Sequence, residues 1–267
     1  MEAVSAVKMR KSQTRALTGR PYARAALSVL SRLSGSLKTI RHRLTVVRPL
    51  SRVAVVVITS DKGLCGVLNA AVIREADRAI KELGLPAESV SIYAFGKKGA
   101  EFFERRGYDL KVRFDNVSDD VQIVDFENVG RALATAFSLS YFDRVIVVYT
   151  RFKSTFEQFA VSRAVLPLSV EAMREIVEGI IPERGVFAEK RMEEPPAPAY
   201  YTVEPSPETV LDTLIPRLAG VVLYHALLES KASEHSARMV AMKNASDKSY
   251  DLSKSLTREF NKARQTL

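Results

Sequence analysis

The chain has 267 residues, of which 46% are hydrophobic and 27% are charged, a composition that suits a soluble protein with a core of its own. A single cysteine excludes a disulfide within the chain, and one cysteine with three scattered histidines argues against a closed structural zinc site. No apolar run in the sequence reaches the length of a membrane-spanning helix; the continuous run at 53–58 has the length of a strand.

The net charge of +9 is concentrated at the start of the chain. Residues 1–50 hold eleven lysines and arginines against one acidic residue, Glu2. Such a segment is either the solvated face of a long helix or a surface that meets an acidic protein, a nucleic acid or an anionic lipid. Charge alone does not choose among these.

A coiled-coil helix is predicted over residues 1–48. Apolar residues recur there at alternating spacings of four and three, which places them along one side of a helix: Ala26, Leu30, Leu33, Leu37, Ile40, Leu44 and Val47. Pro21 is expected to kink or divide the helix, and Pro49 to end it.

A compact α/β domain is predicted over residues 51–204. Strands are expected at 52–59, 89–96, 108–114, 143–152, 158–168 and 197–203, and helices at 68–84, 97–107, 124–141 and 171–180. The β-branched run at 52–59 is typical of a strand that is buried on both faces. Alternation of strands and helices at this pace predicts a doubly wound, mostly parallel, Rossmann-like sheet.

A second coiled-coil helix is predicted over residues 206–267. Its seam again keeps spacings of four and three, then shifts by a residue: Leu214, Leu218, Val221, His225, Leu228, Ala232, His235, Met239 and Met242, followed by Ala245, Ser249, Leu252, Leu256, Phe260 and Ala263. From Pro207 onward one helix would be roughly 90 Å long, more than a compact domain of this size can bury. We therefore expect the two terminal helices to pair antiparallel, against the alternative of two ordinary core helices.

The segment TSDKGLCGVLN at 59–69 lies between a strand and a helix, where an α/β fold presents a phosphate loop. It matches neither glycine-rich phosphate motif, so a strand-to-helix turn, capped by Ser60 or Asn69, is the favoured interpretation. Cys65 has no histidine near it in sequence and is expected to be a buried, inert thiol.

The remaining polar candidates do not form a catalytic constellation. His225 and His235 are interpreted as polar seam residues rather than metal ligands. The acidic pair Asp119 and Asp120 is expected to be solvated on a loop. We predict no catalytic residue, no metal site and no cofactor.

Three segments together resemble a known family. ITSDKGLCGVLN at 58–69, MEAVSAVKMRKSQ at 1–13 with RPYA at 20–23, and ALLESKASEHSARMVAMKNASDKSYDLSKSLTREFNKARQ at 226–265 resemble the signature segments of the gamma subunit of F-type ATP synthases. The last match is the most specific, and the order of the three agrees with the family. In this resemblance the chain is shortened at both termini.

The resemblance implies a central rotor shaft: an antiparallel coiled coil above a small α/β domain, with no catalytic site of its own. It implies rotation inside a ring of alpha and beta subunits, a foot on the epsilon subunit and the membrane c-ring, no nucleic-acid partner, and a peripheral location on the inner, cytoplasmic face of the energy-coupling membrane. By motif position, the residues facing the ring are Met1, Arg238 and Gln265, with Lys8 and Arg10 as weaker candidates. The family loop corresponds to Ser60, Asp61, Gly63, Leu64, Cys65, Gly66 and Asn69, and Val67 departs from it by standing where the family has a second glycine.

Two other functions stay open from the residues alone. One is a nucleotide-binding α/β protein with a helical arm, motivated by the loop at 60–66. The other is a basic coiled-coil protein that binds nucleic acid, motivated by the charge of the first 50 residues and weakened by the scarcity of aromatic residues among them.

Overall fold

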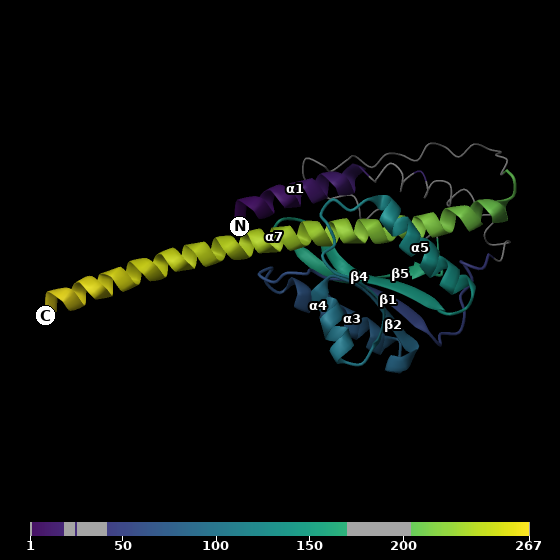
Figure 1. The fold of residues 1–267 in the computed structure, drawn as a ribbon, viewed down its shortest axis with the longest axis horizontal. Coiled ribbons are helices and arrows are strands. Elements are labelled where there is room, and N and C mark those ends of the chain that lie inside the picture. Colours follow the sequence, from purple (N-terminus) through teal and green to yellow (C-terminus); the bar gives the residue numbers. More distant parts are fainter. Residues whose placement is uncertain (1, 19–24, 26–41, 170–203, 267) are drawn as a thin grey trace.

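The computed structural model describes residues 2–18, 25, 42–169 and 204–266. A five-stranded sheet with strand order β3-β2-β1-β4-β5 lies at its centre (Figure 1). The strands are β1 (Val53–Ile58), β2 (Val90–Phe95), β3 (Asp109–Phe114), β4 (Arg144–Phe152) and β5 (Gln158–Leu166). Strands β1 to β4 pair parallel with one another, and β5 pairs antiparallel with β4. The predicted mostly parallel sheet is thereby confirmed.

Helices cover both faces of the sheet, as a central strand without polar side chains requires. Val53, Val55 and Val57 of β1 pack on one face beside helices α3 (Leu68–Glu82) and α4 (Lys97–Arg105). The alternating residues Ala54, Val56 and Ile58 pack on the other face with α5 (Ile123–Ser138) and α7 (Pro207–Thr266). A 3₁₀ turn, Ala87–Ser89, precedes β2. All these helices and strands begin and end within three residues of their predicted bounds.

Helix α7 is both a core helix and a projecting arm. It has 60 residues, crosses the sheet, and leaves the globular part on the side where Figure 1 marks the C-terminus. From Leu218 to Leu228 every residue is buried, so the helix is surrounded there rather than packed along one narrow seam as the sequence predicted. The apolar part of α7 is long and apolar enough for a membrane span, yet 67% of that stretch is buried in the protein, as in a core helix.

Two glycines allow α5 and α7 to touch backbone to backbone. A Cβ atom on Gly130 of α5 would lie 2.4 Å from the main-chain nitrogen of Gly220 on α7. A Cβ atom on Gly220 would lie 2.7 Å from the Cα atom of Glu127. The crossing therefore leaves no space for a side chain at either position.

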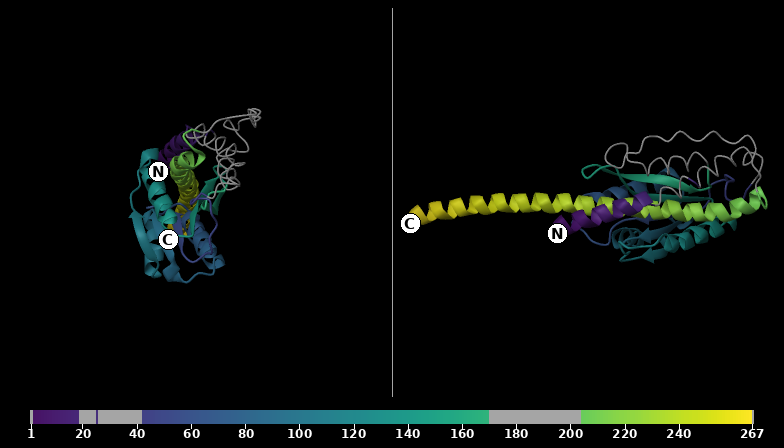
Figure 2. Two further views of the ribbon diagram at one scale, coloured as in Figure 1. Left: turned by 90° about the vertical axis from the view of Figure 1, so that its right-hand side faces the viewer. Right: turned by 90° about the horizontal axis from the view of Figure 1, so that it is seen from above.

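Helix α1 (Glu2–Thr18) lies alongside α7 and runs in the opposite direction, as both views of the ribbon show (Figures 1 and 2). Its buried residues Ser5, Met9 and Ser12 keep the spacing of four and three that a helix-pairing seam needs. The predicted antiparallel pairing of the two terminal helices is therefore confirmed for these residues.

The prediction is wrong for the last residues of the N-terminal seam. Leu44 lies in a turn and is buried in the core of the globular part, where its carbonyl oxygen accepts a hydrogen bond from the Leu168 amide at 2.8 Å. Val47 is exposed. The spacing of apolar residues cannot distinguish a helix seam from a chain that dips into a core. The earlier seam residues Ala26, Leu30, Leu33, Leu37 and Ile40, the helix expected at 171–180 and the strand expected at 197–203 lie outside the described residues.

Candidate functional site

The loop between β1 and α3 is held together by its own side chains. The Asn69 carboxamide oxygen accepts a hydrogen bond from the Ser60 amide at 2.9 Å, and its nitrogen donates to the Ser60 hydroxyl at 2.7 Å and to the Cys65 sulfur at 3.3 Å. Cys65 is buried, as expected. The helix cap is not as expected: Val67 is the N-cap of α3 and makes no capping hydrogen bond through its side chain, so Ser60 and Asn69 fasten the loop instead.

A side chain of the same loop also caps the neighbouring helix α4. The Asp61 carboxylate accepts a hydrogen bond from the Lys97 amide at the start of α4, at 3.0 Å. A carboxylate at the N-terminus of a helix satisfies the partial positive charge that attracts a phosphate, and it repels an anion. Leu64 and Gly66 both adopt left-handed backbone angles, with φ of 62° and 61°. These angles are those of a tight turn.

Arg238 connects this loop to α7. Its guanidinium donates to the Gly63 carbonyl oxygen at 3.3 Å and to the Glu234 carboxylate at 2.7 Å. Both charged side chains are only 10% exposed. One of the residues that the family resemblance assigns to the stator-facing surface is therefore bonded within the chain, to another segment of the same signature.

A second cluster forms around Asp119, on the loop between β3 and α5. Its carboxylate lies 3.0 Å from Nε2 of His235, 2.8 Å from Nζ of Lys8 and 3.7 Å from Nζ of Lys231. The hydrogen bond from His235, opposed by burial and aided by Lys8, lowers the pKa of Asp119 far below its usual range. The expectation of a solvated aspartate is wrong, because the fold brings the cations of α1 and α7 to it.

Asp120 extends this cluster to the outer side of α1. Its carboxylate pairs with Lys11 at 2.6 Å and with Arg15. Lys8, Lys11 and Arg15 are three and four residues apart and so lie on one face of α1. The basic face of α1 was the feature of the sequence that could have indicated this cluster. Part of the N-terminal positive charge pairs with an acidic loop of the same chain.

The remaining predicted contact residues are not gathered in one place. Arg10 is exposed on α1, Gln265 is exposed near the end of α7, and Met1 lies outside the described residues. The structure thus joins Arg238 to the family loop and Lys8 to Asp119, and it leaves Arg10 and Gln265 on the surface.

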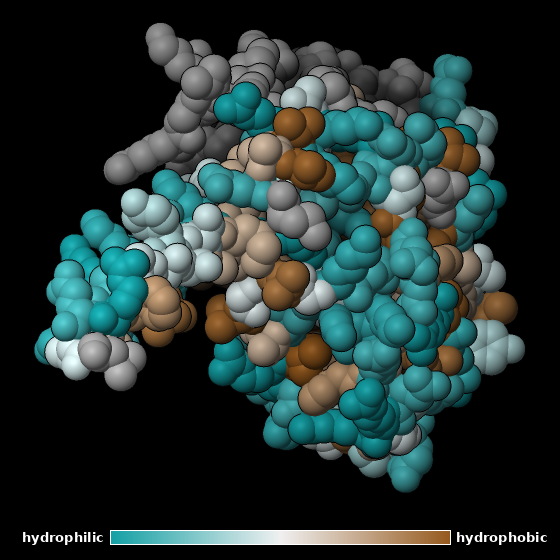
Figure 3. All heavy atoms as spheres, turned by 60° about the vertical axis from the view of Figure 1, so that its left-hand side comes forward, coloured by the Kyte–Doolittle hydropathy of each residue, from teal (hydrophilic) through white to brown (hydrophobic). Residues whose placement is uncertain are grey.

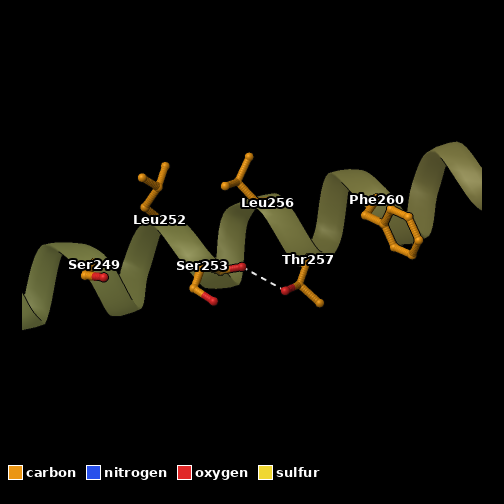
Figure 4. Close-up of a pocket in the computed structure, with 6 residues that line it drawn as sticks. All are labelled: Ser249, Leu252, Ser253, Leu256, Thr257 and Phe260. Carbon is orange, nitrogen blue, oxygen red and sulfur yellow. Dashed lines mark hydrogen bonds between the residues drawn. The ribbon is translucent and has the colours of Figure 1, made fainter.

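The last part of α7 stands clear of the rest of the described chain. Every described residue from Lys243 onward is exposed, and Figure 3 shows this arm projecting from the globular part. Tyr250, Leu252, Leu256 and Phe260 are large hydrophobic residues exposed on the arm. In Figure 4, Leu252 and Leu256 point to the same side of the helix, away from Ser253 and Thr257. An apolar stripe of this kind is a surface for packing against protein.

A shallow groove lies where the arm leaves the globular part. It has a volume of about 280 Å³ and is lined by the family loop, the start of α3, the hairpin between β4 and β5, and α7. Phe156, at the tip of the hairpin, is 85% exposed beside it.

Comparison with known proteins gives these features a context. A family model described as ATP synthase matches residues 1–267. The ATP synthase gamma chain of Heliobacterium modesticaldum is 35% identical over 265 residues, which cover 99% of this chain and 86% of the relative. The ATP synthase gamma chain of Roseiflexus castenholzii is 37% identical over 267 residues, covering 99% of this chain and 85% of the relative.

Solved structures agree. The central stalk with c-ring of the Tetrahymena thermophila mitochondrial ATP synthase contains a chain that is similar with a TM-score of 0.65 and 25% identity, covering 92% of this chain and 97% of that one. A chain in the rotor of the Euglena gracilis mitochondrial ATP synthase has the same fold, with a TM-score of 0.57, 17% identity, and coverage of 100% and 98%.

Proposed function

Because this chain belongs to the gamma-chain family of ATP synthases, whose members form the rotor in the central stalk, we propose that it couples ion-driven rotation to ATP synthesis and hydrolysis at sites on other subunits. It contributes no catalytic residue of its own on this proposal. Its task is mechanical: to carry torque between the membrane rotor and the catalytic ring.

The observation that carries the proposal is the exposed arm of α7. The helix is buried in the globular part at one end and exposes Leu252, Leu256 and Phe260 at the other. This arrangement is expected of a shaft that is enclosed by other protein subunits. An unpartnered apolar stripe is costly in water, and insertion into a ring of subunits removes it from water. The arm is what the alpha and beta subunits would surround.

The globular part would be the foot. We propose that it contacts the epsilon subunit and the membrane c-ring, which makes the chain a peripheral component of a membrane-bound complex, on the inner, cytoplasmic face of the energy-coupling membrane. Arg10 and Gln265, exposed on the two paired helices, are the contact candidates best available to the ring. Lys8 and Arg238 would take part only if they exchanged their partners within the chain.

Nucleotide binding at the family loop is the weaker alternative. Asp61 accepts the Lys97 amide at the N-terminus of α4 and Asn69 accepts the Ser60 amide, so these two donors already have partners, and the loop matches neither glycine-rich phosphate motif. We therefore favour a loop that fastens the foot to the shaft over a loop that binds a nucleotide.

The test is co-expression of this chain with alpha and beta subunits of an ATP synthase, followed by size-exclusion chromatography and an ATPase assay. The expected result is a complex in which the three chains co-elute and hydrolyse ATP, while this chain alone is inactive. A matched pair of variants sharpens the test: Leu256→Asp places a charge on the exposed stripe, whereas Asn261→Asp places it roughly 140° around the helix from Leu256. Loss of co-elution with Leu256→Asp alone supports insertion of the arm; equal assembly by both variants, or ATPase activity in this chain by itself, would refute it.

A further inference from the structure

Helix α7 leaves the globular part through a short polar segment. Before it, residues 218–228 are buried and almost all apolar; after it, from Lys243, the helix is exposed. Between them, residues 230–238 are mostly buried yet largely polar: Ser230, Ser233, Glu234, His235, Ser236 and Arg238. We call this segment the collar. Its polarity is unexpected at a position where plain hydrophobic packing would bury the helix equally well.

On one side the collar is hydrogen-bonded to the main chain of the β4–β5 hairpin. The Thr150 amide donates to the Ser230 hydroxyl at 3.2 Å, and the Ser236 hydroxyl donates to the Thr155 carbonyl oxygen at 2.7 Å. The Gln158 carboxamide nitrogen braces the same carbonyl at 2.7 Å and reaches the Ser236 hydroxyl at 3.4 Å. The serine side chains therefore hold the backbone of the hairpin directly.

On its other face the collar holds two loops. Nζ of Lys231 donates to the Val117 carbonyl oxygen at 2.7 Å, and His235 meets the Asp119 carboxylate at 3.0 Å. The Arg238 guanidinium donates to the Gly63 carbonyl oxygen at 3.3 Å. At roughly 100° of rotation per residue, these three side chains share one face of the helix, and Ser230 and Ser236 lie on the far side of it. Three separate segments of the globular part thus grip one stretch of helix less than three turns long.

Such bonds add a directional restraint to the resistance that close packing already offers. Apolar contacts have no preferred direction of their own, and they resist rotation only because interlocked side chains would have to repack. Hydrogen bonds weaken steeply when donor and acceptor move out of line, and a buried donor that loses its partner is penalised. A helix held by such bonds on two faces cannot turn about its axis without breaking some of them.

We propose that the collar is the torsional anchor of the shaft, the place where torque passes between the globular foot and the arm of α7. Ser230 and Ser236 are its positioning residues. The inference rests on the proposed rotor function and adds to it the residues through which the two parts are locked. The buried apolar stretch of α7 stabilises the fold, and the collar adds the directional bonds that fix its rotational setting.

The test variant is the double substitution Ser230→Ala with Ser236→Ala, which removes two hydroxyls with little change in volume. The control is Ser253→Ala with Ser255→Ala, on the exposed arm of the same helix. In the isolated chain, we expect hydrogen exchange at the Thr150 amide to become roughly 5-fold faster in the test variant, the factor for losing one ordinary hydrogen bond. The control should exchange like the unmodified chain.

The second readout is torsional stiffness in the assembled ring of alpha and beta subunits. A bead is attached to the globular part through Lys81→Cys on the surface of α3, and its angular fluctuations are recorded during catalytic pauses. The collar variant should show wider fluctuations than the control while it hydrolyses ATP at the control's rate. A variant that merely folded less well would lose assembly and ATPase activity together.

The outcomes separate the two proposals. Failure of the unmodified chain to assemble would overturn the rotor function, and hydrogen exchange at Thr150 in the isolated chain would still decide whether the serines hold the hairpin. Assembly with unchanged fluctuations in the collar variant would overturn the anchor. Should the double variant fail to assemble, Ser230→Ala and Ser236→Ala are compared singly, and stiffness equal to the control in both would likewise overturn it.

Discussion

The Arg238 guanidinium lies 3.3 Å from the carbonyl oxygen of Gly63, a residue 175 positions earlier in the chain. The same guanidinium is paired with Glu234 one turn back on its own helix. Two segments that the sequence presents as separate signatures, a turn after β1 and a stretch of the last helix, are thus one structural unit.

Replacing Arg238 with glutamine should destabilise the isolated chain by about 3 kcal/mol, because it leaves the Glu234 carboxylate buried without its cation. The measurement is urea unfolding followed by circular dichroism. Arg258→Gln, on the exposed arm of the same helix, is the control and should change stability by less than about 0.5 kcal/mol. Equal effects of the two substitutions would mean that the Arg238 bonds contribute nothing specific.

Asp119→Asn should lower stability at pH 7 and change how stability depends on acid. The pKa of Asp119 is lowered in the folded chain, so its contribution is present above the ordinary aspartate pKa of about 3.9 and is lost as the pH falls through the folded value. The difference in unfolding free energy between the unmodified chain and the variant should be about 2 kcal/mol at pH 7 and shrink below about pH 4. Urea unfolding at a series of pH values measures it.

The neighbouring carboxylate provides the comparison for that prediction. The Asp120 side chain is 58% exposed, against 22% for Asp119, so water and salt screen its ion pairs with Lys11 and Arg15. Asp120→Asn should therefore have the smaller effect, and 0.5 M salt should remove most of it. A larger loss from Asp120→Asn than from Asp119→Asn would contradict the central position assigned to Asp119.

Gly130→Ala should be strongly destabilising, by about 3 kcal/mol or more, because the added methyl group would overlap the backbone of α7 at Gly220. Gly63→Ala introduces the same methyl group where no atom lies within 4 Å and should change stability little. Thermal unfolding distinguishes them. A well-folded Gly130→Ala protein would show that α5 and α7 can separate at their crossing.

Leu223→Ala and Leu256→Ala remove the same atoms from the two ends of one helix. Leu223 is fully buried and its truncation should cost about 3 kcal/mol. Leu256 is 55% exposed, so its truncation should leave the isolated chain within about 0.5 kcal/mol of the unmodified one, yet weaken assembly with alpha and beta subunits. Unchanged assembly by Leu256→Ala would argue against a packing role for the stripe.

The globular part could be predicted from the sequence in detail because its signals are local. A β-branched run such as residues 53–58 can only be a buried strand, and glycines at 84 and 107 mark the ends of the helices before them. The terminal helices were harder. Spacing places Leu44 in a seam, but the turn that carries it into the core depends on contacts with Leu168, far along the chain.

The partners in the long-range polar contacts could not be predicted. Nothing near Asp119 in sequence indicates that Lys8 and His235 converge on it, since more than 100 residues separate it from each. The serines of the collar have no periodicity that differs from that of solvent-facing serines on the arm. Their partners are backbone groups, which leave no trace in a pattern of side chains. Only the arrangement of β4, β5 and the two loops around α7 gives these residues a role.

The exposed arm has a consequence for the life of the chain before assembly. A helix segment that packs against no other described part of the chain is only marginally stable in water, so its last turns open readily and are accessible to proteases. Enclosure by other subunits would protect the arm from opening and from proteolysis. We expect unassembled copies to be degraded quickly and assembled copies to persist. Degradation of the excess would then keep the amount of this chain matched to the amount of its partner subunits.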